Sequence, residues 1–264
     1  MSGELLRITL GRQRLGPGDA LIICQNMNLS TPRFSPGQTL LIDADDTLWE
    51  NNIYFERAIA SFIAYLNHHE YSREEVREQL NLAERETIRQ HGYGLSSFRR
   101  SLVACFEKLS TAPVTEEKHQ RIMSFAQAIA DQEMELLDGV LDALPTLAAR
   151  HQLILMTKGN KLEQADKLAR SGIADFFAAV EIAHEKDPAA YTDVCTRHAL
   201  CAGNTWMIGN SPRSDINPAL AAGLHAVLVH HPHTWVLEHE AVNPAPEGQH
   251  LLEINGFRTL LEHF

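Results

Sequence analysis

The sequence predicts an α/β protein whose doubly wound parallel sheet is interrupted by an inserted all-helical domain. Short apolar runs without polar alternation, separated by helical stretches, recur through the second half of the chain, as in the βαβ units of a parallel sheet covered on both faces. One further apolar run lies much earlier, and a long stretch with helical periodicity separates it from the others. These two observations predict a Rossmann-like core that begins, is interrupted and then resumes.

Length and composition limit the kind of protein. A chain of 264 residues, 44% of them apolar, can bury one sizeable core and a smaller second one. A formal net charge of -11 disfavours general binding to nucleic acid or to an anionic membrane, because the long-range field repels both. The four cysteines form no CxxC pair, which argues against a zinc site or a disulfide framework. Charged residues break up the first 24 residues, so we expect no signal peptide and a cytoplasmic protein.

Residues 1–37 are expected to form a loose N-terminal arm. Gly16-Pro17-Gly18 and Ser35-Pro36-Gly37 interrupt its short apolar segments, which permits a small hairpin or a disordered arm but no domain. A true start at Met27 is an equally open alternative. None of the chemistry predicted below depends on this arm.

The first predicted strand is the apolar run at residues 39–42. Residues 52–135 then place apolar side chains at steps of three and four, which predicts four amphipathic helices, the last of them capped by Thr115. The predicted division of the chain is therefore a core and a helical insertion, the core formed by residues 38–50 and 138–264 and the insertion by residues 51–137.

Strands and helices alternate after Asp138-Gly139. The predicted strands lie at residues 153–156, 178–182, 206–208 and 226–229, and the predicted helices begin at Lys161, Pro188 and Arg213. Parallel pairing follows, because a helical crossover returns the chain to the same end of the sheet.

Polar residues follow the predicted strands, where an open α/β sheet binds its ligand. Asp43 and Asp45 come directly after the first strand, two residues apart, so both carboxylates lie on one face of an extended segment. Two acids so placed can divide the work of a displacement reaction. One serves as an ionised nucleophile and the other as the general acid that protonates a leaving oxygen, then as the base for water.

The later strands end in groups suited to a phosphoryl ligand. Thr157 and Lys158 follow the second strand at the start of a helix, where a hydroxyl and N–H groups can receive phosphoryl oxygens. The cation of Lys186 follows the third strand and can neutralise charge in the transition state. The fourth strand leads to Asn210-Ser211 and on to Asp215, and acids gathered near Asp43 call for a hard cation such as Mg²⁺.

This set resembles the four motifs of the haloacid dehalogenase (HAD) superfamily, in the right order over residues 40–230. The most specific of them, DxDxT followed by an apolar residue, reads Asp43-Ala44-Asp45-Asp46-Thr47-Leu48. The resemblance implies a Mg²⁺-dependent phosphatase that forms an aspartyl-phosphate. It assigns Asp43 as nucleophile and metal ligand, Asp45 as acid/base and ligand through its carbonyl, Thr157 as phosphate-binding, Lys186 as the partner of the nucleophile, and Asp215 as a metal ligand or orienter.

Two positions depart from the usual motifs, and the insertion adds expectations of its own. Asn210 stands where an aspartate often follows the glycine, and Lys158 stands where a small or amide residue is common. The resemblance makes the helical insertion a C1-type cap that closes over the substrate. Arg99 and Arg100 are predicted either to reach a second anionic group of the substrate or to form a solvated helix face.

Other residues near the motifs have weaker functional signals. Asp46 is expected to be structural, and Trp49, Asn51 and Asn52 are expected at the hinge between core and insertion. A metal cluster at His230, His231 and His233 is the less favoured interpretation, because no second ligand group stands at useful spacing.

Several functions remain open at this point. A phospho-acceptor signalling domain uses similar acids but would not carry so long an insertion after its first strand, and retention of both acids disfavours a catalytically dead binding protein. Within the superfamily, Asp45 favours phosphoryl transfer over carbon–halogen cleavage, whereas a phosphatase and a phosphomutase are not separated. The expected partner is a small phosphorylated metabolite, with no nucleic acid polymer and no membrane, and the protein is expected to be a monomer or homodimer.

Overall fold

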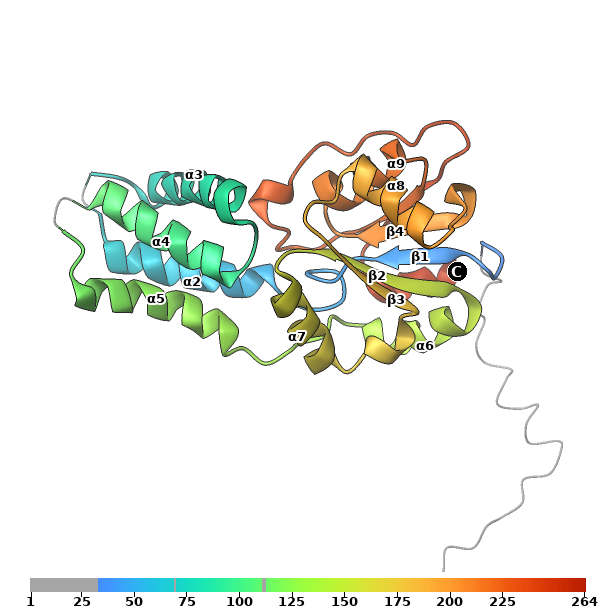
Figure 1. Cartoon of the computed structure of the whole chain (residues 1–264), viewed down its shortest axis with the longest axis horizontal. Coiled ribbons are helices and arrows are strands. Elements are labelled where there is room, and N and C mark those ends of the chain that lie inside the picture. The colour runs from blue at the N-terminus through green and yellow to red at the C-terminus, as the bar shows by residue number, and fades with distance from the viewer. Residues whose placement is uncertain (1–32, 69, 111–112) are drawn as a thin grey trace, which may run out of the picture.

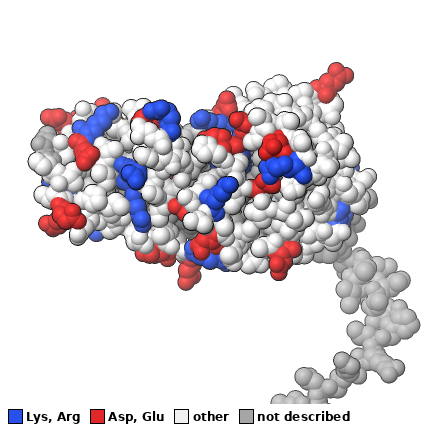
Figure 2. Space-filling model, in the orientation of Figure 1, with Lys and Arg blue, Asp and Glu red and all other residues white. Residues whose placement is uncertain are grey.

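The computed structural model describes residues 33–68, 70–110 and 113–264. Most of the predicted N-terminal arm, residues 1–32, lies outside the described residues. A sheet flanked by helices forms one part of the molecule, and a group of four helices forms the other (Figure 1). Within the described residues no helix is both long enough and apolar enough to cross a membrane. On the face shown in Figure 2, basic side chains lie among acidic ones.

The sheet is doubly wound and entirely parallel, as predicted. Its six strands run in the order β3-β2-β1-β4-β5-β6. The bounds are Thr39–Ile42 (β1), Gln152–Lys158 (β2), Ala179–Ala183 (β3), Thr205–Gly209 (β4), His225–Val229 (β5) and Leu251–Ile254 (β6). The sixth strand was not predicted. Its Leu-Leu-Glu-Ile sequence is short and half exposed at the edge of the sheet, so it lacks the unbroken apolar run of a central strand.

Alternate side chains of the central strands enter two separate cores. Leu40 and Ile42 of β1 belong to the core under α6 and α7, whereas Leu41 between them belongs to the core under α8 and α9. These helices cover opposite faces of the sheet (Figure 1). They extend over Val140–Arg150 (α6), Lys161–Ser171 (α7), Pro188–Arg197 (α8) and Asn217–Ala221 (α9). The absence of alternation in the first strand is therefore explained by burial of both of its faces.

Two helices of the core differ from the prediction. Helix α6 was not predicted, although it follows Asp138-Gly139 directly and buries Val140, Leu144 and Leu147. The helix expected from Arg213 begins instead as a π-helical turn, Pro212–Ile216, before α9. The carbonyl of Ser211 accepts from the N–H groups of both Asp215 and Ile216, at 2.9 and 3.1 Å, and this widens the turn.

The inserted segment forms a four-helix unit with a hydrophobic core of its own. Its helices are Asn52–Leu66 (α2), Arg73–His91 (α3), Leu95–Leu109 (α4) and Glu116–Ala130 (α5). Phe62, Leu80, Leu102 and Ile122 are fully buried, one from each helix. Thr115 caps α5, as the sequence indicates, by accepting from the N–H of Lys118. The unit therefore has a core separate from those on the two faces of the sheet.

The two connections between core and insertion lie side by side. The N–H of Glu50 donates to the carbonyl of Glu135 at 2.9 Å, and that of Leu137 donates to the carbonyl of Leu48 at 3.0 Å. Trp49 on the outgoing connection is fully buried. These hydrogen bonds fix the point at which the insertion leaves the sheet.

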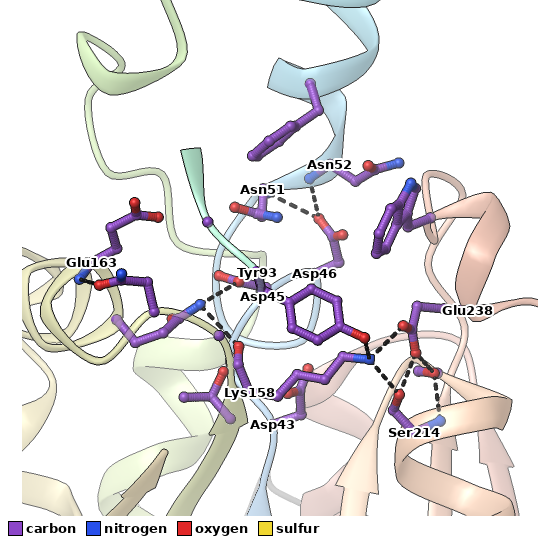
Figure 3. A pocket seen from close by; sticks show the side chains of 18 of the residues that line it. Asp43, Asp45, Asp46, Asn51, Asn52, Tyr93, Lys158, Glu163, Ser214 and Glu238 are labelled. Carbon is purple, nitrogen blue, oxygen red and sulfur yellow. Dashed lines mark hydrogen bonds and ion pairs between the residues drawn. The ribbon is translucent and has the colours of Figure 1, made fainter. Parts of the chain in front are cut away.

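Short 3₁₀ turns complete the chain. They occupy Ala174–Phe176 (η1), Ala202–Asn204 (η2), Val236–Glu238 (η4) and Phe257–Glu262 (η5). The turn η4 lies in the segment of residues 230–250 between β5 and β6, which we call the C-terminal loop. It is important for the site, because it brings this loop to the carboxyl ends of the strands (Figure 3).

Candidate active site

Strand order places the candidate site at the carboxyl end of β1. This strand lies between β2 and β4, where the winding of the sheet reverses direction. In doubly wound sheets a crevice opens outside the strand ends at that point. Asp43 follows β1, Thr157 and Lys158 end β2, and Asp215 follows β4. Residues distant in sequence thus meet because of topology alone.

Asp43, Lys186 and Asp215 form a buried charged group. The Lys186 Nζ donates to Asp43 Oδ1 at 2.5 Å and to Asp215 Oδ1 at 2.7 Å. All three residues are at most 6% exposed. Burial, together with the charge of Asp215, raises the pKa of Asp43 to about 7, although Lys186 opposes both effects. One lysine therefore does not fully offset two buried carboxylates.

Gly209 and Asn210 lie directly beside this group of charged residues. A Cβ on Gly209 would lie 2.2 Å from Asp215 Oδ2, so the acid occupies the space that a side chain would need. The N–H of Ser211 donates to the same Oδ2 at 3.0 Å. Asn210 lies beside Thr47, whose hydroxyl is 3.1 Å from Asp43 Oδ2 and 3.4 Å from the Asn210 amide oxygen. The amide thus stands near the nucleophile candidate despite the departure from the usual motif.

Asp45 lies apart from this group and has partners of its own. Lys167 Nζ lies 2.8 and 3.0 Å from its two carboxylate oxygens, Gln164 donates at 2.8 Å, and the Trp49 indole donates at 2.6 Å. Burial alone would raise the pKa of Asp45, but the charge and hydrogen bonds of Lys167 outweigh it and hold that pKa below its usual range. The two carboxylates of the DxD motif therefore have different environments, and their pKa values are shifted in opposite directions.

Thr157 and Lys158 have different positions although they are adjacent. Thr157 is 2% exposed and lines the cavity, and its hydroxyl has no side-chain hydrogen bond to the described residues. Lys158 Nζ instead donates to Glu238 at 2.6 Å and to Ser214 at 2.8 Å, with its charge over the Tyr93 ring (Figure 3). Thr157 is free to bind a phosphoryl oxygen, whereas Lys158 is already engaged.

The donor atoms around Asp43 suit a hard divalent cation. The carboxylates of Asp43 and Asp215 converge within a buried space and carry two negative charges against the single positive charge of Lys186, so an additional positive charge would be stabilising there. Carboxylate and carbonyl oxygens are the ligands that Mg²⁺ prefers. The residues present therefore fit the ion that the motifs imply.

A cavity of about 170 Å³ lies over these groups. Its walls come from the strand ends, from α7, from the C-terminal loop and from helices α2, α3 and α4 of the insertion. This volume resembles that of cavities that hold a single six-membered ring. A ligand in this cavity would contact both the core and the insertion.

Asp46, two of the predicted hinge residues and the arginine pair have definite positions. Asp46 Oδ1 accepts from the N–H groups of Asn51 and Asn52, both at 2.9 Å, and so satisfies the start of α2 (Figure 3). Arg99 donates to Gln127 of α5, and neither it nor Arg100 lines the cavity. The side of α4 that faces the cavity carries Ser97, Phe98 and Ser101 instead. The expectation that Arg99 or Arg100 reaches the substrate is not met.

His231 lies in a small cluster at the start of the insertion. Its Nε2 is 3.4 Å from Glu50 Oε2 and its Nδ1 is 4.0 Å from Asp46 Oδ1, so one donor atom of each residue falls within a 4.8 Å group. Because Asp46 Oδ1 already accepts two backbone N–H groups, the cluster has a structural use, which is to fasten the outgoing connection to the C-terminal loop.

Several lining residues have no motif to mark them. Lys167 and Gln164 on α7, Tyr93 between α3 and α4, and Glu238 on the C-terminal loop were not predicted. Of these, only Tyr93 has a local sequence signal, since it stands between two glycines that interrupt the helical pattern. The others resemble ordinary surface residues in the sequence.

The fold and the paired aspartates define a HAD-type hydrolase, and the family comparison agrees. Residues 40–229 match the family model described as haloacid dehalogenase-like hydrolase. The chain belongs to this family. It is 28% identical to a haloacid dehalogenase-like family hydrolase from Xanthomonas campestris, with a TM-score of 0.71 over 86% of this chain and 94% of that one.

Two further comparisons show how widely the fold is used. The chain is 28% identical to N-acylneuraminate-9-phosphatase of Mus musculus over 102 residues, which is 37% of this chain and 41% of that protein. The match thus spans less than half the length of this relative. L-2-haloacid dehalogenase from Xanthobacter autotrophicus has the same fold, with a TM-score of 0.58 and 16% identity over 85% of this chain and 97% of that one. Fold alone therefore does not choose between phosphate and halide chemistry.

Proposed function

We propose that this hydrolase is a Mg²⁺-dependent phosphomonoesterase that acts on a small phosphorylated metabolite. The observation that carries the proposal is the pair of aspartates with separate environments: Asp43 lies with Lys186 and Asp215, and Asp45 lies with Lys167. A displacement with a covalent intermediate needs both a nucleophile and an acid/base. The mouse relative that the chain resembles over part of its length is named as a phosphatase, which agrees with the proposal.

The chemistry follows from the positions of these side chains. A carboxylate oxygen of Asp43 attacks phosphorus and the ester P–O bond breaks. Asp45, which must first take up a proton from solvent against the charge of Lys167, gives that proton to the leaving oxygen. Asp45 then accepts a proton from water, whose oxygen attacks the phosphorus of the aspartyl-phosphate. Inorganic phosphate leaves and Asp43 is restored.

The other groups hold the phosphoryl oxygens and the nucleophile. Thr157 offers a free hydroxyl beside the strand ends, and Lys186 orients Asp43. Asp43, the Asp45 carbonyl and Asp215 would hold Mg²⁺, which when bound neutralises charge on the phosphoryl group. Asn210 and Ser211 lie next to this set and line the same cavity.

Asp45 also argues against carbon–halogen cleavage. Halide is a stable anion that leaves without a proton, so a dehalogenase has no use for a general acid at this position. In this protein three side chains hold the Asp45 carboxylate at the cavity wall. Such an arrangement favours an oxygen leaving group.

The test is release of inorganic phosphate from p-nitrophenyl phosphate and a panel of small phosphomonoesters, with Mg²⁺ and with EDTA. Asp43→Asn is expected to remove turnover, and Asp45→Asn to lower it by about 10²–10⁴-fold, the usual contribution of a general acid or base. Asp175→Asn, at an exposed aspartate in η1, is the matched control and should behave as wild type.

The products distinguish this proposal from its neighbours. A phosphotransferase would consume the ester and form a second ester in place of inorganic phosphate. A phospho-acceptor domain would retain the phosphoryl group on Asp43. Turnover that persists in Asp43→Asn, or that EDTA leaves unchanged, would contradict the proposal.

A further inference from the structure

We call the part of the cavity that is lined by the insertion the leaving-group pocket. It lies where the organic part of a phosphomonoester would extend from the phosphoryl site, between the strand ends and helices α2, α3 and α4. Its lining residues are Phe55, Glu84, Ile88, Ser97, Phe98 and Ser101. Half of these side chains are apolar, two offer a hydroxyl and one is an acid.

No free cation lines this cavity among the described residues. Its three lysines are all paired: Lys186 with Asp43 and Asp215, Lys167 with Asp45, and Lys158 with Glu238. No arginine belongs to the lining. A second anionic group on a substrate would have to break one of these pairs or remain without a cationic partner.

Glu84 is the acid of the leaving-group pocket itself. It is 5% exposed, and one oxygen lies 3.3 Å from Arg77 Nη1. Arg77 also pairs with Glu56 at 2.7 Å, so this group of three side chains carries one more negative than positive charge when all are ionised. Glu163, which accepts the N–H of Leu95 at the start of α4, lines the cavity as a further acid.

We propose that the leaving-group pocket favours phosphomonoesters with a largely apolar leaving group over those with a second anionic group. Glu84 is the residue that discriminates charge. This inference rests on the proposed phosphatase function. The preference for an apolar leaving group follows from Phe55, Ile88 and Phe98 in the lining, and the charge limit from the paired lysines and the excess acid.

Three matched esters test the inference: benzyl phosphate, 4-carboxybenzyl phosphate and 4-(aminomethyl)benzyl phosphate. They share the ring and the leaving oxygen and differ in the substituent at the far end of the ring, which is a hydrogen, a carboxylate or an aminomethyl cation. At pH 8, above the pKa of about 7 to which burial raises Glu84, we expect kcat/KM for the carboxylate to be lower than for benzyl phosphate by on the order of tenfold, since like charges in a partly buried site repel strongly. The ammonium ester should equal or exceed benzyl phosphate. N-acylneuraminate 9-phosphate, which carries a carboxylate, should likewise be a poor substrate.

Variants assign the discrimination to Glu84. Glu84→Gln should raise the kcat/KM ratio of carboxylate to benzyl ester severalfold, whereas Glu86→Gln, at an exposed glutamate of the same helix, should leave the ratio unchanged. Ile88→Lys places a cation in the pocket one helical turn from Glu84 and should also favour the carboxylate. This second variant keeps the test decisive if Glu84→Gln fails to fold.

The possible outcomes separate the two proposals. If all three esters are hydrolysed equally, or if Glu86→Gln shifts the ratio as Glu84→Gln does, the charge inference is overturned while the phosphatase function stands. If none of the three is hydrolysed while another ester of the panel is, the inference is overturned and the phosphatase function stands. If no ester of any kind is hydrolysed with Mg²⁺ present, the phosphatase function itself fails, and the inference fails with it.

Discussion

Gly209 is the residue at which the backbone and an active-site acid come closest. The carboxylate of Asp215 lies where a Cβ would stand, and the N–H of Ser211 holds it there. Any side chain at this position must displace either the acid or the end of β4. The glycine is therefore required by close approach and not by a turn.

Gly209→Ala is expected to lower the free energy of unfolding by about 1–3 kcal/mol, the usual cost of forcing an extra methyl group into a packed site. Urea denaturation measures this change. Gly203→Ala is the control, because a Cβ there would meet nothing within 4 Å. Equal effects of the two substitutions would show that Asp215 can move aside without cost.

Glu84 links the leaving-group pocket to stability. Burial raises its pKa from 4.5 to about 7, although Arg77 opposes the shift. Between these values the folded state keeps a proton that the unfolded state releases, so the contribution of Glu84 to stability is present below about pH 4.5 and is lost as pH rises to about 7.

Glu84→Gln should remove this dependence. Relative to wild type, the variant is expected to gain roughly 1–3 kcal/mol between pH 5 and pH 8, because each pKa unit corresponds to ~1.4 kcal/mol. Urea midpoints across this range provide the measurement, and the difference between the two proteins cancels the other titrating groups. The difference in free energy of unfolding between Glu86→Gln and wild type should stay constant with pH, because Glu86 is exposed. The same constancy for Glu84→Gln would contradict the raised pKa of Glu84.

At the scale of elements, local signals decide where the helices of the insertion begin. Ser72 and Glu75 form a reciprocal capping box at the start of α3: the serine hydroxyl accepts from the N–H of Glu75, and the glutamate accepts from the N–H of Ser72 at 2.7 Å. Two N–H groups without helical partners are satisfied in this way. This helix carries Glu84 and Ile88, which line the cavity. The residue at which the helix begins therefore also determines where these two side chains lie relative to the sheet.

Ser72→Ala is expected to cost about 1 kcal/mol of stability, the usual loss of a cap. Thermal or urea unfolding followed by circular dichroism measures it. Ser124→Ala, at an exposed hydroxyl inside α5, should change the stability by less than about 0.5 kcal/mol. A negligible effect at Ser72 would mean that the contacts of α3 with α4 alone fix this helix.

At the scale of the whole molecule, the two parts enclose the site together. Tyr93 of the insertion donates to Glu185 of the core at 2.7 Å and lies 3.3 Å from Lys158. The N–H of Leu95 donates to Glu163 on α7. These contacts hold the insertion against the strand ends, and they surround the cavity with groups from both parts (Figure 3).

Magnesium is expected to stabilise the molecule as a whole, because an ion held by Asp43 and Asp215 binds only the folded chain. At one hundred times its Kd the gain is about 2.7 kcal/mol, a rise in Tm of roughly 5–10 °C for a chain of this size. Thermal unfolding with Mg²⁺ and with EDTA measures the shift. Asp215→Asn should lose most of it and Asp175→Asn should keep it, whereas an equal shift in both variants would place the ion elsewhere.

The sequence by itself determined the class of fold and the order of the motifs. Unbroken apolar runs mark central parallel strands because both faces of the sheet are covered, and Asp43 and Asp45 follow the first of these strands. The edge strand β6 and helix α6 were missed. Strand β6 is short and half exposed. Helix α6 lies directly before β2, whose clear apolar run was the first predicted element of this part of the chain.

Only the tertiary structure decided which charges meet. Lys167 faces Asp45 across 122 positions of sequence, and Lys158 turns from the phosphoryl site toward Glu238. Arg99, on a helix that reaches the cavity, points instead toward α5. Local periodicity specifies which face of an element is apolar, but the partner of a polar side chain depends on distances between elements, and those are set by the packing of the whole chain.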